Sequence, residues 1–227
     1  MFVTGRPPRW MHPVAEETGH RGLAICANGA LVYDLHDERV VESFLLDAST
    51  LRKAMDTLRA RIPDAAFGVE YGTSFAHEQS YLLRWDVGRP HVAIVEAGRL
   101  AERPAAKLLL RHEGREADDL LDAARDVLED LVEVTHSSAS GAGLLEISAL
   151  GVSKASTLAR LCDERRVPAE AVLAFGDMPN DLPMLAWAGT AYAMANAHPD
   201  VLAAVDRHTA SNDEDGVAVV LERAFAY

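Results

Sequence analysis

The stretch "VLAFGDMPNDLPML", residues 172–185, decides the fold. The apolar run at Ala171–Phe175 ends at Gly176, as a parallel strand that is buried on both faces does. Two acidic residues, Asp177 and Asp181, follow at once. Carboxylates at the mouth of one strand repel each other unless a positive charge neutralises them. The stretch therefore predicts a buried strand whose carboxyl end carries a charged site.

Strands and helices alternate on both sides of this stretch. Ser153–Val167 places its apolar residues on one helical face, and Asn180–Ala188 is a short helix that Asn180 can cap. Such alternation predicts an α/β fold with a doubly wound parallel, Rossmann-like sheet, whose ligands bind beyond the carboxyl ends of the strands. The other elements expected here are strands at Leu144–Ser148 and Thr190–Ala195 and a helix at Pro199–Val205.

The middle of the chain has a different character. Its strand-like runs mix with two amphipathic helices, near Thr50–Arg61 and Glu116–Val132. The first residues again fit the α/β sheet predicted around residues 172–185, because Phe2-Val3 and Leu23–Cys26 are short apolar strands. We therefore expect an α+β cap domain inserted into an α/β core, with a polar hinge at His136–Gly143. The expected bounds are core at 1–36, cap at 37–143 and core again at 144–227.

Composition restricts the partners. The net charge of −13 argues against nucleic acid and anionic membranes as main partners, but it does not exclude phosphorylated small molecules. Cys26 and Cys162 lie far apart in apolar stretches, which favours buried thiols in a reducing compartment over a disulfide. No signal peptide or membrane span is visible, so the cytoplasm is the expected location. The sequence does not decide whether the chain forms a homodimer.

The sequence around Lys154 has two interpretations. In Gly151-Val152-Ser153-Lys154, Ser153 is the expected helix N-cap, which places Lys154 in the first turn. A cation there opposes the helix dipole at a cost of about 0.3–1 kcal/mol. Either an anion lies beside it, a phosphate or an acid on the neighbouring strand, or the lysine bends into solvent.

The sequence GDMPND also allows two interpretations. Oxygen ligands that leave room for water suit Mg²⁺, which predicts a magnesium site at Asp177 and Asp181. Alternatively, the stretch is a turn rich in turn-forming residues, with Asp181 as the acid of a helix N-terminus.

Two fragments near the N-terminus are weaker signals. Thr4-Gly5-Arg6 offers a hydroxyl, a permissive glycine and an arginine, which suit phosphate oxygens, but a strand-to-helix turn explains them equally well. Asn28-Gly29 is a hairpin turn signal.

In this order, four stretches resemble the haloacid dehalogenase superfamily, and within it the Cof-type phosphatases with a large α/β cap. They are TGRP at 4–7, ICANGALVYD at 25–34, LEISALGVSKASTL at 145–158 and LAFGDMPNDLPML at 173–185. The resemblance implies a Mg²⁺-dependent phosphatase that forms an aspartyl-phosphate and acts on a small phosphorylated metabolite, such as a sugar phosphate.

The resemblance also implies roles for single residues. Thr4 would bind the phosphate, Lys154 would balance the charge of the nucleophile and the phosphoryl group, and Asp177 would bind Mg²⁺ with support from Asp181. Phosphoryl transfer needs positioning and charge neutralisation above all, which such a set supplies. The residues implied on the substrate side are Thr4, Gly5, Arg6, Asn28, Lys154 and Asn180.

The nucleophile of the family is the feature that this sequence lacks. Its DxDGT motif should end a strand upstream of Thr4, yet Met1 lies three residues before Thr4. We therefore expect no turnover from the chain as written, because of either a start codon assigned too far downstream or a true truncation. Asp213–Gly216 spells DxDG, but polar residues precede it, so a loop is expected there.

Two other classes of function remain as alternatives. One is a non-catalytic remnant that binds Mg²⁺ or a phosphorylated ligand. The other is a receiver-like signalling domain, which also pairs acids with a lysine, although receivers are compact and this chain carries a long insertion.

Overall fold

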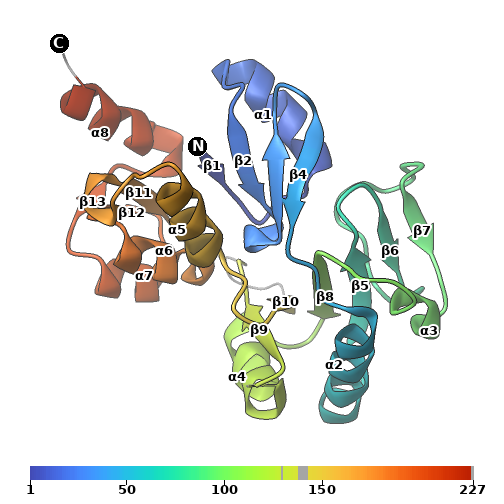
Figure 1. Cartoon of the computed structure of the whole chain (residues 1–227). Helices are drawn as coiled ribbons and strands as arrows, with labels where there is room; N and C mark the ends of the chain where they lie inside the picture. Colours follow the sequence, from blue (N-terminus) through green and yellow to red (C-terminus); the bar gives the residue numbers. More distant parts are fainter. Residues whose placement is uncertain (129, 138–142, 226–227) are drawn as a thin grey trace. The chain divides into compact units, whose positions relative to one another are not determined.

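The strands of the described residues, 1–128, 130–137 and 143–225, form three sheets in the computed structural model of the protein (Figure 1). The sheets have four, six and three strands. The chain divides into two compact units, Met1–Ser153 and Lys154–Tyr227. The first unit holds the four-stranded and six-stranded sheets, and the second holds the three-stranded sheet.

A mixed sheet of four strands begins the first unit. β1 (Phe2–Val3) runs parallel to β2 (Leu23–Cys26), and α1 (Met11–Thr18) lies between them in the chain. The sheet continues with β3 (Leu31–Asp34) and β4 (Arg39–Ser43), both antiparallel to their neighbours. The strands expected at the start of the chain are therefore confirmed.

The turn between β2 and β3 needs a left-handed backbone. Asn28 has φ 59° and Gly29 has φ 106°. Glycine adopts such angles freely, and asparagine is among the few other residues that tolerate the left-handed region. The hairpin turn predicted from Asn28-Gly29 is confirmed.

A six-stranded, largely antiparallel sheet forms the rest of the first unit (Figure 1). Its spatial order is β7-β6-β5-β8-β10-β9. The strands are β5 (Ala66–Glu70), β6 (Phe75–His77), β7 (Val92–Ile94), β8 (Lys107–His112), β9 (Val132–Thr135) and β10 (Gly143–Ala149). The helices are α2 (Ala48–Arg61), α3 (Ala97–Leu100) and α4 (Ala117–Leu128).

One face of this sheet is apolar and packs on helices. Leu108 and Leu110 of β8 are fully buried in a cluster with Leu58 of α2 and Leu120 of α4. Because successive strand residues point to opposite faces, Lys107, Leu109 and Arg111 lie together on the other face. That second face is called the polar face below. Besides Lys107 and Arg111, it carries Glu70 of β5, His77 of β6 and Glu146 of β10.

The position of β10 differs from its expected place in the core. The strand predicted at Leu144–Ser148 is present, but it pairs with β8 and β9. It therefore belongs to the sheet of the inserted α+β module. A short apolar run shows that a strand exists and does not show which sheet it joins. Of the hinge expected at His136–Gly143, residues 138–142 lie outside the described part of the chain.

The second unit has the predicted α/β alternation. β11 (Leu173–Gly176), β12 (Thr190–Met194) and β13 (His208–Thr209) form a parallel sheet in that order. The helices are α5 (Lys154–Glu164), α6 (Leu182–Trp187), α7 (Pro199–Ala204) and α8 (Gly216–Phe225). The parallel strands place their carboxyl ends at one edge of the sheet, which is the edge where ligands of such sheets bind.

The burial of β11 is lower than expected. Leu173 and Phe175 are only half-buried, whereas Ala174 and Gly176 are buried. The alternation shows that one face of β11 is less covered than the other. Within the described residues β11 pairs with β12 alone and is therefore an edge strand of its sheet. The ring of Phe175 stacks on Tyr192 of β12, with ring centroids 5.7 Å apart.

Two further expectations concern the state of the cysteines and the absence of membrane spans. Cys26 and Cys162 are buried free thiols, as predicted. Among the described residues, no helix combines the length and the apolarity that crossing a bilayer requires.

Candidate active site

Lys154 is the first residue of α5 and is 7% exposed. Its Nζ donates to Asp181 Oδ1 at 2.7 Å and to Asn180 Oδ1 at 3.2 Å. The ammonium group therefore faces an acid of the neighbouring segment and does not bend into solvent. The contact explains why the sequence tolerates a cation in the first turn of a helix, since a buried carboxylate offsets the unfavourable dipole.

Asp181 is held from both sides. Its second oxygen, Oδ2, accepts the backbone N–H groups of Asp177 at 3.1 Å and Met178 at 3.2 Å. Gly176 makes this approach possible, because a Cβ at that position would lie 2.6 Å from Asp181 Cβ. Asp181 thus fixes the turn after β11 and orients Lys154 at the same time.

The predicted cap of α6 is wrong. The 3-10 turn Pro179–Asp181 precedes the helix, and Asp181, not Asn180, occupies the position before its first residue. The Asn180 side chain is 7% exposed and accepts the hydrogen bond from Lys154. A turn-forming residue before a helix is typical of a cap. In the structure the Asn180 side chain accepts from the buried Lys154 instead.

Asp177 lies at the carboxyl end of β11, half-buried. Its backbone carbonyl accepts the N–H of His198 at 2.8 Å. Its Oδ2 accepts a hydrogen bond from Asn212 Nδ2 at 2.9 Å. The Asp177 carboxylate is therefore held by Asn212, in the segment after β13, as well as by its place at the end of β11.

Asn212 is a site residue that the sequence reasoning missed. It follows the short strand β13 and begins the 3-10 turn Asn212–Glu214. The available signal was its place, because residues just after parallel strands gather at the same edge of the sheet. The polar run Thr209–Asn212 was interpreted only as a loop.

The residues that could hold a metal ion are few. Within residues 1–128, 130–137 and 143–225, no group of three or more His, Cys, Asp or Glu side chains is arranged to hold one. Both oxygens of Asp181 are engaged by Lys154 and by backbone N–H groups. Asp177 is the carboxylate that remains for a cation. Mg²⁺ is commonly bound through one or two carboxylates with water and substrate oxygens completing its shell, so Asp177 fits that ion.

The predicted residues Thr4, Gly5, Arg6 and Asn28 lie together in the first unit. Thr4 Oγ1 accepts the N–H of Arg6 at 3.1 Å, and the Thr4 carbonyl accepts the N–H of Asn28 at 3.1 Å. A Cβ on Gly5 would lie 2.8 Å from Asn28 Oδ1, so a larger residue there would require the Asn28 side chain to shift. The turn after β1 and the hairpin after β2 thus form one structure.

A buried ion pair from the six-stranded sheet supports this turn. Lys107 Nζ donates to the Gly5 carbonyl at 2.9 Å and pairs with Glu146 on β10. Glu146 Oε2 also accepts from Ser137 Oγ at 2.7 Å. Burial alone would raise the pKa of Glu146, but Lys107 and the hydrogen bonds from Lys107, Ser137 and Asn28 hold it below its ordinary value. No local sequence pattern predicts this pair, because its members are 39 residues apart.

The DxDG sequence at Asp213–Gly216 has the expected loop structure. Its first two residues lie in a 3-10 turn, and Asp215 has a left-handed backbone with φ 56°. No strand end presents these acids. The structure therefore gives no support to this segment as a rigidly held nucleophile.

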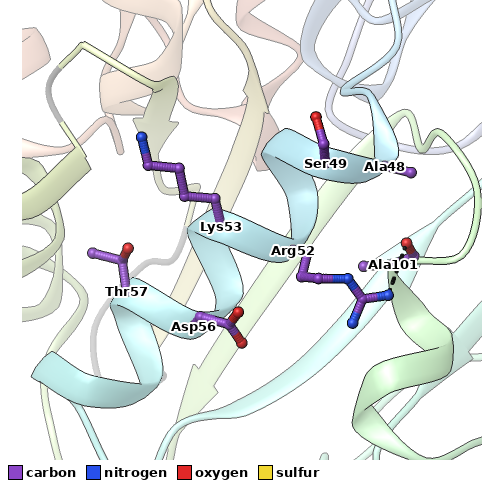
Figure 2. A pocket seen from close by; sticks show the side chains of 7 residues that line it. All are labelled: Ala48, Ser49, Arg52, Lys53, Asp56, Thr57 and Ala101. Atoms are coloured by element: carbon purple, nitrogen blue, oxygen red, sulfur yellow. Dashed lines mark hydrogen bonds between the residues drawn. The ribbon is translucent and has the colours of Figure 1, made fainter.

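A pocket of about 450 Å³ on α2 contains none of the predicted site residues (Figure 2). Arg52 crosses it and donates to the carbonyls of Gly98 at 3.1 Å and Ala101 at 3.4 Å. The lining residues are Ala48, Ser49, Arg52, Lys53, Asp56, Thr57 and Ala101. Its open surface and mixed charge do not match the buried Lys154 group, so it is not the candidate site.

The sequence profile of the haloacid dehalogenase-like hydrolases matches residues 1–221. The chain belongs to this family. Three comparisons illustrate the family relationship. A 5-amino-6-(5-phospho-D-ribitylamino)uracil phosphatase of Bacillus subtilis, YitU, is 26% identical over 234 residues, covering 98% of this chain and 83% of the relative.

The pyridoxal phosphate phosphatase YbhA of Escherichia coli is 26% identical over 229 residues, which cover 96% of this chain and 83% of the relative. The solved structure of SMU.1108c from Streptococcus mutans UA159 has a TM-score of 0.85 at 22% identity, covering 99% of this chain and 85% of that one. The structural match confirms the α/β fold with its inserted module. The family and its named relatives identify the chain as a hydrolase of the phosphatase type.

Proposed function

We propose that this haloacid dehalogenase-like hydrolase is a Mg²⁺-dependent phosphatase of a small phosphorylated metabolite. The observation that carries the proposal is the buried group of Lys154, Asn180 and Asp181 beside Asp177, at the carboxyl end of β11. The relatives named above are phosphatases of 5-amino-6-(5-phospho-D-ribitylamino)uracil and of pyridoxal phosphate, which supports a small phosphate monoester as substrate. The buried free thiols agree with a reducing cytoplasm.

Each residue of this group has a distinct task. Lys154 places a fixed positive charge where phosphoryl oxygens accumulate negative charge, and Asp181 keeps its ammonium group in place. Asp177 would hold Mg²⁺, which supplies further neutralisation of the phosphoryl charge when bound. Asn180 accepts from Lys154 through Oδ1, and the family resemblance places it on the substrate side.

The turn of the first unit would bind the phosphate. Thr4 offers a hydroxyl, Gly5 permits close approach, and Arg6 brings a guanidinium group that suits phosphate oxygens. Asn28 supports the same turn from the hairpin. These assignments rest on the family resemblance and on the grouping of the four residues.

The 227 residues contain no DxDGT sequence, and Asp213–Gly216 does not lie at a strand end. We therefore propose that this polypeptide binds Mg²⁺ and phosphate but has no turnover by itself. The alternatives are a remnant that only binds Mg²⁺ and phosphate and an enzyme that hydrolyses a phosphate ester. Measuring both binding and hydrolysis distinguishes them.

The test is calorimetric titration of the full chain with MgCl₂ in the presence of inorganic phosphate, followed by an assay with p-nitrophenyl phosphate. Asp177→Asn should weaken Mg²⁺ binding at least tenfold, whereas the exposed control Asp200→Asn should leave it unchanged. Equal Mg²⁺ affinity in Asp177→Asn and the unchanged protein would refute the metal role. Hydrolysis that disappears in Asp177→Asn would show an enzyme, and binding without hydrolysis would show a binding protein.

A further inference from the structure

Among the described residues, an arginine without an acidic partner is buried on the polar face of the six-stranded sheet, where its side chain hydrogen-bonds Tyr81. Arg111 of β8 is 6% exposed, and its Nε and Nη1 are buried without a hydrogen-bond partner. A buried guanidinium group without a counter-charge is costly, by several kcal/mol for the loss of hydration alone, as an order of magnitude. Proteins that retain such a charge commonly use it.

The nearby acids of the polar face are already committed to other cations. Glu70 Oε2 pairs with Arg9 at 2.6 Å, and its Oε1 accepts the N–H of Gly72 at 2.8 Å. Glu146 pairs with Lys107 and accepts from Ser137. In the described part of the chain no ion pair includes Arg111. The side chain is therefore left with donors that a ligand could use.

A second unpartnered polar atom points to the same place. His77 of β6 is 4% exposed, and its Nε2 is buried without a partner. Its Nδ1 lies 2.7 Å from the carbonyl oxygen of Glu78, which can only accept, so Nδ1 carries the hydrogen. Nε2 of the neutral ring is then an acceptor, which suits a ligand hydroxyl group and does not donate to an anion. Both side chains contact Tyr81: the His77 ring centroid lies 5.8 Å from its ring, and Arg111 Cζ lies 5.2 Å from it.

The surroundings select the kind of anion. Phe75 and Tyr81 are buried with Ala66, and Leu83 and Leu109 pack against them. Moving a singly charged carboxylate into such apolar surroundings costs less than moving a doubly charged phosphate. We infer that Arg111, beside the ring of Tyr81, forms a binding site for the carboxylate group of a small organic ligand.

The position of Arg111 suggests which ligand this is, a step that rests on the proposed function. Lys107 and Arg111 lie on one face of β8, four residues apart, which is about 13 Å along a strand. Lys107 holds the Gly5 carbonyl of the turn proposed to bind phosphate. A phosphate ester with a carboxylate at its far end would reach from that turn to Arg111.

The experiment uses the full chain and needs neither Mg²⁺ nor turnover, so it is independent of the proposed function. Thermal unfolding is measured in sodium benzoate, in sodium phosphate and in sodium chloride at equal ionic strength. Benzoate should raise the unfolding midpoint above that in chloride. Titration should show benzoate binding that is at least tenfold weaker in Arg111→Met and unchanged in the exposed control Arg99→Met.

Three results would overturn the site. They are no benzoate response in the unchanged protein, a response that survives in Arg111→Met, and a response to phosphate without one to benzoate. If Arg111→Met does not fold, Arg111→Lys replaces it, because a lysine keeps the charge but not the guanidinium geometry and should bind benzoate several-fold more weakly. Without ligand, Arg111→Met should melt no lower than the unchanged protein, whereas a purely structural arginine would lower the midpoint.

Discussion

The two units each bury a lysine–carboxylate pair, Lys154–Asp181 and Lys107–Glu146, and the pairs have different surroundings. Both are more than nine-tenths buried. Lys154 heads a helix beside the carboxyl end of a parallel strand, where Asp177 remains half-buried. Lys107 lies on an antiparallel sheet and holds the carbonyl of Gly5. The same chemical pair therefore prepares a site in one unit and fixes a turn in the other.

The largest expected effect comes from breaking either pair. Lys154→Met and Lys107→Met should each destabilise the protein by about 3–5 kcal/mol, because a buried carboxylate loses its partner. Hydrogen exchange should show faster opening of β11 and β12 in the first variant and of β8 and β10 in the second. A loss below about 1 kcal/mol in urea unfolding would mean that the pair is not buried in solution.

A smaller effect is expected from Gly176→Ala. The added Cβ would lie 2.6 Å from Asp181 Cβ and would push that carboxylate away from Lys154. Overpacking of this kind costs about 1–3 kcal/mol in urea unfolding. The matched control is Gly98→Ala in α3, where nothing lies within 4 Å of the new Cβ and a helix favours alanine. Equal stability of the two variants would contradict the close contact.

The smallest expected effect is on pH dependence, and it concerns the pair of the first unit. Burial would raise the pKa of Glu146, but the charge of Lys107 and the hydrogen bonds from Lys107, Ser137 and Asn28 together hold it below its ordinary value of 4.5 in the folded protein. Its contribution to stability is thus present above pH 4.5 and is lost as the pH falls through the lowered pKa. The stability difference between the unchanged protein and Glu146→Gln should shrink in acid.

Glu70 provides the opposite control for that measurement. Burial raises its pKa in spite of Arg9, so the folded protein takes up this proton before the unfolded chain does. The stability of the unchanged protein should therefore rise relative to Glu70→Gln as the pH falls through that raised pKa. Urea unfolding between pH 7 and about pH 3 measures both differences, because the lowered pKa of Glu146 lies below 4.5. Parallel curves for the two variants would contradict the assignment.

The site of the second unit was predictable because its signals are local. The apolar run, the glycine and the acids of residues 172–185 lie within one strand–turn–helix unit, and Lys154 heads the helix before it. The structure brings Lys154, Asn180 and Asp181 into contact, as their order along an α/β chain implies. The capping role of Asn180 and the burial of β11 on both faces were wrong, and the catalytic roles of these residues stay predictions.

The site residues of the first unit were harder to predict because their partners are remote. Glu146 was visible as one charge in an apolar strand, and Lys107 as the first residue of another. Nothing local indicates that strands 39 residues apart become neighbours, or that Lys107 reaches a carbonyl 102 residues away. For the same reason β10 was assigned to the core rather than to the sheet of the insertion.

The contact between Gly5 and Asn28 has a consequence for how this sequence can drift over evolutionary time. Asn28 must accept a left-handed backbone and also present an amide, and asparagine is the residue that meets both demands. A side chain at Gly5 would force that amide to shift. A change at Gly5 is therefore better tolerated when Asn28 changes too, and a library randomised at both should return correlated survivors rather than independent ones.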